Sequence, residues 1–107
     1  MIDSAMLAAA CREAAVRIDE NPVVWAQGYY WRDGRGCVVG IVARELGLAD
    51  SFSNRNVVSD TLGDLGDLFG GTLAETWNDD KRRTPASVAR ELRSVAERLV
   101  QAGPVAG

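Results

Sequence analysis

Apolar residues recur every three or four positions in several stretches of the chain, and each stretch predicts a helix. The first helix is predicted over residues 3–19, with Asp3 or Ser4 placed to cap its first turn. Its apolar stripe consists of Leu7, Ala10, Cys11, Ala14 and Ile18. Further helices are predicted over residues 37–46, 57–69, 72–77 and 84–100. Thr72 and Glu75 have the spacing of a capping box, and Thr84-Pro85 is a typical helix start.

Residues 23–36 break this helical pattern. Valines and aromatic residues favour extended backbone, Gly28 interrupts them, and Asp33-Gly34 indicates a turn. Either a short β-hairpin or an ordered aromatic loop fits the segment. The predicted fold class is therefore mainly α: a single compact domain of four to five helices spanning residues 1–107, with its core over residues 3–100 and a frayed tail over 101–107.

The length, composition and net charge of the chain exclude several kinds of chemistry. The 107 residues suffice for one core, and the absence of histidine excludes Ser-His-Asp and Cys-His systems and histidine metal ligands within the chain. A net charge of −3 argues against nucleic acid or an anionic membrane as partner. Residues 1–10 do not resemble a signal peptide, and no apolar run reaches the ~20 residues of a membrane span. A cytoplasmic protein with free Cys11 and Cys37 is expected, without metal or cofactor.

Cys37 is the best placed nucleophile, since it stands at a predicted helix N-terminus near Arg35. Both features favour the thiolate and are expected to lower the pKa of this cysteine. Asp79, in the predicted turn 78–80, is the carboxylate that could accompany it. The simpler interpretation is a small buried residue that begins an apolar helix, because free cysteines are among the most buried residues.

Three surfaces are candidates for binding. The first is an aromatic group, since exposed tryptophan and tyrosine dominate binding hot spots, although the same rings could simply cover the core. It comprises Trp25, Tyr29, Tyr30 and Trp31. The second is an acidic helix face with Asp60, Asp64 and Asp67, for which a solvated face is the simpler interpretation. The third is a basic segment with Arg82, Arg83, Arg90 and Arg93, which could pair with the acidic face within one chain or between two.

A set of short motifs resembles a family of small actinobacterial and actinophage proteins known only as a domain of unknown function. Its members show a Trp and a Gly near an aromatic stretch, a Cys-x-x-Gly helix start, a Trp-Asn-Asp turn and a Thr-led last helix. The matching residues are Trp25, Gly28, Cys37, Gly40, Trp77, Asn78, Asp79 and Thr84. The resemblance covers residues 23–100 and departs from the family pattern at Ile41-Val42. It implies a high-GC host and no particular activity.

The function expected from these features is a non-enzymatic module that binds another protein, encoded in one version by a phage to modify a host protein. The aromatic group and the acidic face would form its surface, and homodimerisation stays open. The alternative is a small hydrolase or transferase that uses Cys37 with Asp79. Weak nucleic-acid binding through residues 81–98 is a third hypothesis.

Overall fold

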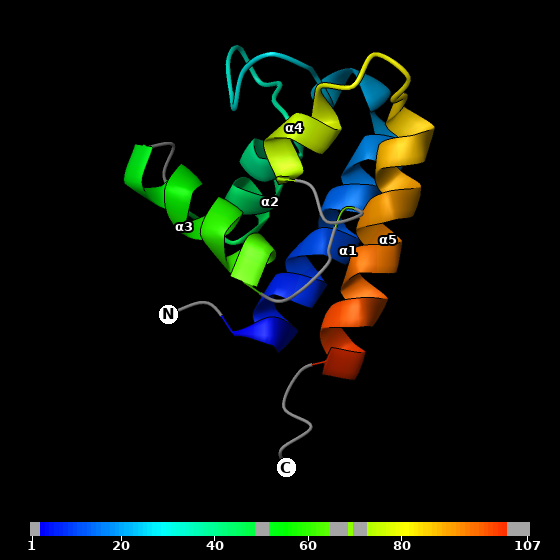
Figure 1. Cartoon of the computed structure of the whole chain (residues 1–107). Coiled ribbons are helices and arrows are strands. Elements are labelled where there is room, and N and C mark those ends of the chain that lie inside the picture. Colours follow the sequence, from blue (N-terminus) through cyan, green and yellow to red (C-terminus); the bar gives the residue numbers. More distant parts are fainter. Residues whose placement is uncertain (1–2, 49–51, 65–68, 70–72, 103–107) are drawn as a thin grey trace.

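The computed structural model describes residues 3–48, 52–64, 69 and 73–102, and these form a mainly helical globule (Figure 1). Its elements are α1 (Ser4–Glu20), the 3₁₀ helix η1 (Pro22–Val24), α2 (Val38–Glu45), α3 (Phe52–Asp64), α4 (Ala74–Asn78) and α5 (Pro85–Ala102). Within the described residues, only two isolated bridges, Trp25 with Gly36 and Arg32 with Arg35, have β pairing. The predicted fold class is confirmed; residues 103–107 of the expected tail lie outside the described part.

The two long helices α1 and α5 lie side by side and run in opposite directions (Figure 1). Their predicted stripes meet in the core, where Ile18 and Leu92 are almost completely buried. Both predicted starts are confirmed: Asp3 accepts a hydrogen bond from the amide of Met6, and Thr84 accepts one from the amide of Ser87. In both helices the cap therefore satisfies a backbone amide of the first turn.

Helix α2 is central, as its apolar sequence predicts. Every residue from Val38 to Ala43 is buried, and α1, α3 and α4 all pack against the helix. Gly47 adopts a φ of +75° after its end, and the amides of Gly47 and Leu48 return to the carbonyls of Arg44 and Ala43. This is a Schellman motif, in which glycine removes the steric cost of the left-handed residue.

Two helix boundaries differ from the prediction. The helix predicted over 57–69 starts earlier, at Phe52, because exposed polar residues such as Ser53 and Asn56 belong to its first turns; it is described to Asp64, and residues 65–68 lie outside the described part. The helix predicted over 72–77 is α4, which begins at Ala74; Leu73 precedes it and makes no side-chain cap. Thr72, the predicted cap, lies outside the described part. The carboxylate of Glu75 instead accepts a hydrogen bond from the hydroxyl of Ser59 on α3.

The segment between η1 and α2 is a loop, and we call residues 25–37 the aromatic loop. The predicted turn is present, with Asp33 and Gly34 both at positive φ and Arg32 and Arg35 joined by two backbone hydrogen bonds. At the base of the loop, the amide of Ala26 donates to the carbonyl of Gly36. The loop therefore closes on itself at one end of the helical bundle, beside the link from α4 to α5 (Figure 1).

Candidate functional site

The side chain of Asn78 holds the aromatic loop against α2 and α4. It has no exposed surface, and its Oδ1 accepts from the indole Nε1 of Trp25 at 2.6 Å and from the amide of Val38 at 2.9 Å. Its Nδ2 donates to the carbonyl of Ala26 at 3.1 Å and to Oδ1 of Asp79, also at 3.1 Å. One buried amide thus caps the first turn of α2 and fixes both the ring and the backbone at the start of the loop.

The turn after α4 adds a second set of bonds to the same loop. Gln27 donates through Nε2 to the carbonyls of Asn78 and Asp80, at 3.0 and 2.8 Å. The amide of Gly28, which has a φ of +91°, donates to Oδ1 of Asp79 at 3.0 Å. The Asp79 carboxylate is therefore a loop anchor as well as a candidate site residue.

Two glycines let the loop lie directly on α2. A Cβ at Gly36 or at Gly40 would collide with the backbone carbonyl oxygen of Tyr30. The amide of Cys37 donates to the carbonyl of Tyr29 at 3.1 Å. The close approach explains why the fourth position of Cys-x-x-Gly has no side chain here.

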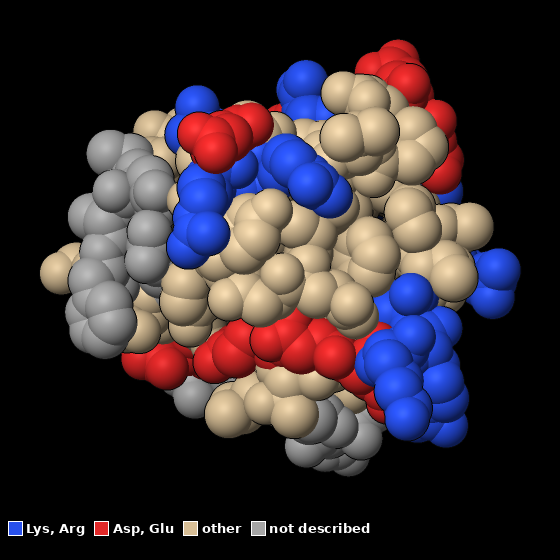
Figure 2. Space-filling view, turned by 90° about the horizontal axis from the view of Figure 1, so that it is seen from above, with Lys and Arg blue, Asp and Glu red and all other residues tan. Residues whose placement is uncertain are grey.

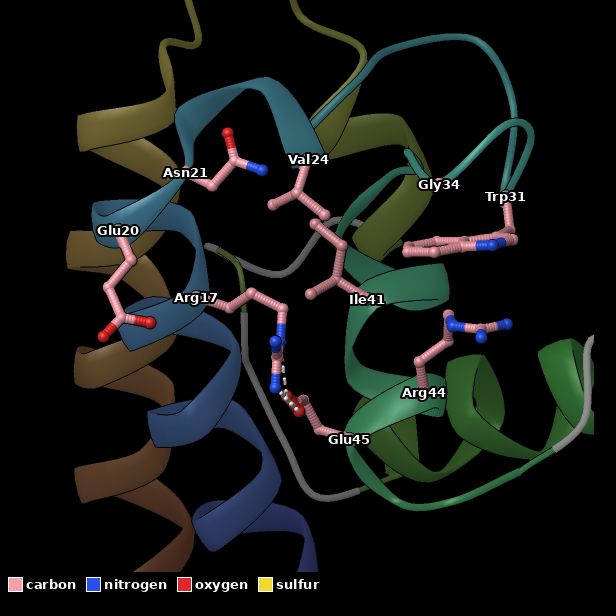
Figure 3. Close-up of a pocket in the computed structure, with 9 residues that line it drawn as sticks. All are labelled: Arg17, Glu20, Asn21, Val24, Trp31, Gly34, Ile41, Arg44 and Glu45. Carbon is pink, nitrogen blue, oxygen red and sulfur yellow. Dashed lines mark hydrogen bonds and ion pairs between the residues drawn. The ribbon is translucent and has the colours of Figure 1, made fainter.

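The aromatic loop separates two hollows. The larger has a volume of about 390 Å³ and lies between α1, η1, α2 and the far side of the loop (Figure 3). The indole of Trp31 forms one wall with the guanidinium of Arg44 stacked 4.5 Å from its ring centroid, and Val24 and Ile41 supply apolar surface. At its lower edge in Figure 3, Arg17 forms a bidentate ion pair with Glu45, the shortest N···O distance being 2.6 Å.

The smaller hollow, of about 180 Å³, lies on the other side of the loop and is called the acidic pocket below. Its lining residues are Gly28, Tyr29, Tyr30, Cys37, Glu75 and Asp79. The structure therefore brings Cys37 and Asp79 together, as the enzymatic alternative requires. Glu75 joins them because α4 packs against α2, a contact that sequence spacing does not reveal.

The expected activation of Cys37 is wrong. Burial is the main cause that raises the pKa of this thiol to about 11, and the carboxylates of Asp79 and Glu75 raise it further against the opposing amides of Val39 and Gly40. Arg35 does not assist, because its guanidinium donates to the carbonyls of Val23 and Trp25. Cys37 is a neutral, buried thiol at neutral pH. Cys11 is also buried and free, with a pKa raised to about 12, mainly by burial.

The predicted aromatic group divides into one buried and three half-buried residues. Trp25 belongs to the core and donates to Asn78, whereas Tyr29, Tyr30 and Trp31 keep part of their surface accessible. Tyr29 also stacks with Arg32, whose guanidinium carbon lies 4.6 Å from the ring centroid. The three residues are divided between the hollows: Tyr29 and Tyr30 line the acidic pocket, and Trp31 lines the larger one.

The predicted acidic face is described only in part. Asp60 is exposed on α3, Asp64 ends that helix with a side chain outside the description, and Asp67 lies outside the described residues. Figure 2 views the end of the bundle that carries the aromatic loop, and shows a band of acidic atoms across the lower part of this face, with uncharged atoms on both sides and basic atoms at its right end. Glu75 and Asp79 are exposed or partly exposed acids at this end.

The basic segment does not form one strip. Arg82 pairs with Asp80 and lowers the pKa of that exposed carboxyl through its side-chain hydrogen bonds, and Arg83 stacks on Trp77. Arg93 pairs with Asp19 on α1 at 2.6 Å. The exposed Arg90 lines a third hollow, between α1 and α5, together with Arg93, Arg12 and Glu97. Within the described residues, the ion pairs of this segment thus use acids other than Asp60.

Sequence reasoning missed the residues that join distant segments. It assigned Asn78 to its own turn and Glu75 to a capping box, and it did not single out Gln27 or the Arg17–Glu45 pair. Their partners lie 16 to 53 positions away, so no local spacing could have found them. The one sequence feature that pointed to Asn78 was the Trp-Asn-Asp motif, in which this polar residue lies between a tryptophan and an aspartate.

No group of three His, Cys, Asp or Glu side chains suited to a metal ion occurs within the described residues. None of the helices in the described part is long and apolar enough to cross a bilayer.

Comparison with protein families matches residues 4–98 to a family of unknown function, DUF6197. The match spans most of the chain, so the protein belongs to this family, and the expected membership of a domain-of-unknown-function family is confirmed. The searches of curated proteins and of solved structures found no match.

Proposed function

We propose that this member of the DUF6197 family is a non-enzymatic module that binds another protein through the aromatic loop. The observation that carries the proposal is that Tyr29, Tyr30 and Trp31 are only partly buried, on a loop whose backbone is fixed by Asn78 and by the contacts at Gly36 and Gly40. Aromatic rings dominate binding hot spots, and a loop already in its bound shape loses little entropy on association.

The two hollows support the same proposal. Each lies beside an aromatic side chain of the loop, so a partner could place side chains on both sides of it. On the Trp31 side, the stacked Arg44 and the Arg17–Glu45 pair provide a charged rim around apolar surface. An apolar centre with a charged rim is the usual composition of a protein interface.

The state of Cys37 supports a binding role over the hydrolase or transferase alternative. A thiol with a pKa of about 11 is almost entirely protonated near pH 7, and the two carboxylates beside it oppose formation of the thiolate. One carboxylate oxygen of Asp79, Oδ1, accepts hydrogen bonds from the amide of Gly28 and from Nδ2 of Asn78, which suits an anchor better than a general base.

The proposal includes an origin in an actinobacterial or phage genome and the modification of a host protein. Its support is the amino-acid usage, in which arginine supplies all but one of the 12 basic residues, as GC-rich codons favour. A homodimer through the same surface is one outcome of the test below.

The test is capture of a partner from a host lysate by tagged protein, with Tyr30→Ala and Tyr29→Ala as loop variants. Val100→Ala is the matched control, because it removes an apolar side chain that is 52% exposed near the end of α5, away from the loop. Circular dichroism verifies that each variant is folded. The captured protein is then purified, and its affinity for each variant is measured by calorimetry.

We expect the wild type and Val100→Ala to bind one partner with equal affinity, and a folded loop variant to bind at least about tenfold more weakly, as loss of a hot-spot ring does. Equal affinity of both loop variants, or the absence of any saturable partner, contradicts the proposal. Sedimentation of the wild type over a range of concentrations distinguishes a second copy of the chain from a different protein.

A further inference from the structure

The acidic pocket has the size of a single side chain. Its volume of about 180 Å³ equals that of about six waters at the ~30 Å³ each occupies in the liquid. Pockets for drug-sized ligands have volumes of roughly 300–1,000 Å³. A group that enters this pocket is therefore small, such as the tip of a residue presented by a partner.

Among the described residues, the charged side chains that line the pocket are both acidic, and Arg32 stacks on Tyr29 without lining the pocket. Glu75 and Asp79 line it, and no described ion pair of the chain includes either carboxylate. The hydrogen bonds described for them use Oε2 of Glu75 and Oδ1 of Asp79, so the two acids are held in place. Two oriented carboxylates beside one small cavity create a local negative potential, which favours a cation.

The uncharged walls complement a cation carried on an alkyl chain. Tyr29 and Tyr30 both line the pocket, and the ring of Tyr29 already attracts one cation, the guanidinium of Arg32, 4.6 Å from its centroid. Cys37, which is neutral and only 3% exposed, adds a soft, weakly polar surface that suits methylene groups. A metal ion is a poorer fit, because Ca²⁺ takes six to eight oxygen ligands and the described part of the chain lines the pocket with two carboxylates.

We propose that the acidic pocket receives a lysine or arginine side chain of the partner protein, with Glu75 and Asp79 binding its charge and Tyr29 and Tyr30 enclosing its stem. The inference rests on the proposed function, since it names the chemistry that the aromatic loop recognises. It identifies Glu75 and Asp79 as specificity-determining residues and a basic segment as the part of the partner that docks here.

The test uses the purified full chain, labelled with ¹⁵N, and three small probes. The probes are n-butylammonium, which copies the lysine side chain, n-propylguanidinium, which copies arginine, and butyrate as a control of opposite charge. The reporters are the amide of Gly28, which donates a hydrogen bond to Asp79, and the amide of Cys37, a residue that lines the pocket.

The variants are Glu75→Gln and Asp79→Asn, which keep the shape of each side chain and remove its charge. Asp60→Asn is the matched control, as Asp60 is exposed on α3 and does not line the pocket.

We expect saturable shifts of both reporters with one or both cationic probes and none with butyrate. Glu75→Gln and Asp79→Asn should each weaken binding by about fivefold, the effect of one moderately screened charge pair, while Asp60→Asn leaves it unchanged. Absence of saturable shifts in the wild type, or an equal loss in Asp60→Asn and the pocket variants, overturns the proposal. If a partner binds through the aromatic loop with full affinity to both pocket variants, the inference fails and the proposed function stands. If the cationic probes bind to the wild type but no partner protein is found, the proposed function fails, while the affinity of the pocket for a cationic side chain stands.

Discussion

Replacement of Asn78 by alanine tests whether one buried amide holds the aromatic loop in place. The substitution removes the acceptor of two buried donors, the indole Nε1 of Trp25 and the amide of Val38. Each buried donor left without an acceptor costs about 1–3 kcal/mol, and the carbonyl of Ala26 also loses its donor. We therefore expect Asn78→Ala to lower the free energy of unfolding by about 3–5 kcal/mol. That is a large part of the ~5–15 kcal/mol typical of a domain.

Asn78→Asp is the matched variant, because it keeps the acceptor and removes the donor. Its carboxylate can still accept from Trp25 and Val38, but it cannot donate to Ala26 and it lies beside the carboxylate of Asp79. We expect a loss intermediate between wild type and Asn78→Ala. Trp25→Phe removes only the indole donor, and the cycle Trp25→Phe with Asn78→Ala should give a coupling of about 1–3 kcal/mol, as for residues in one network.

The assay is urea unfolding followed by far-ultraviolet circular dichroism, with hydrogen exchange of the Val38 amide as a local probe. Asn78→Ala should shift the midpoint strongly and speed exchange at Val38, which loses its acceptor. Thr61→Ala is a control, since it removes an exposed hydrogen bond within α3. A loss below about 1 kcal/mol in Asn78→Ala, or unchanged exchange at Val38, would refute the reasoning that buried unsatisfied donors dominate the cost.

Two further substitutions and two measurements on the unsubstituted protein test other parts of the fold. Gly40→Ala should destabilise the protein by about 1–3 kcal/mol in urea unfolding, because the clash with the Tyr30 carbonyl exceeds the ~1 kcal/mol that alanine gains within a helix. Thr84→Ala should cost about 0.5–2 kcal/mol, since Thr84 and Ser87 cap α5 reciprocally, and unchanged thermal stability would contradict this. Iodoacetamide should alkylate Cys37 at pH 8 about 100-fold more slowly than a thiol of pKa 9.0, because the folded pKa is about 11. The free energy of unfolding should accordingly fall as the pH rises from about 9 to 11, where the unfolded thiol ionises and the folded one keeps its proton.

The parts of the fold that depend on local pattern could be predicted from the sequence. The apolar stripes of α1 and α5 repeat over four to five turns, and the caps at Asp3 and Thr84 are local hydrogen bonds. Prediction failed for α3, where polar residues occupy exposed helical turns, because intrinsic propensity is weak compared with packing. The choice between hairpin and loop at residues 23–36 could not be made either, since it depends on contacts with α2 and α4.

The candidate site could be predicted only as a set of separate residues. Cys37, Asp79 and the tyrosines were singled out, but their convergence on one pocket depends on how α4 crosses α2. The predicted lowering of the Cys37 pKa was wrong for a related reason. A helix N-terminus and a nearby arginine are visible in the sequence, whereas the burial of Cys37 and the turning of Arg35 toward Val23 are consequences of tertiary packing.

The two motifs, Cys-x-x-Gly and Trp-Asn-Asp, form one structural unit around the aromatic loop. Gly40 leaves room for the backbone of Tyr30 against α2, and Asn78 accepts hydrogen bonds from the indole of Trp25 and from the first amide of α2. A buried polar network of this kind offers little net stability over an apolar core, but it specifies one arrangement. A module that only needed a stable bundle would have no use for that specification, whereas a module that presents Tyr29, Tyr30 and Trp31 to a partner needs the loop in one conformation. The burial of Asn78 therefore supports the proposal that the aromatic loop binds a partner.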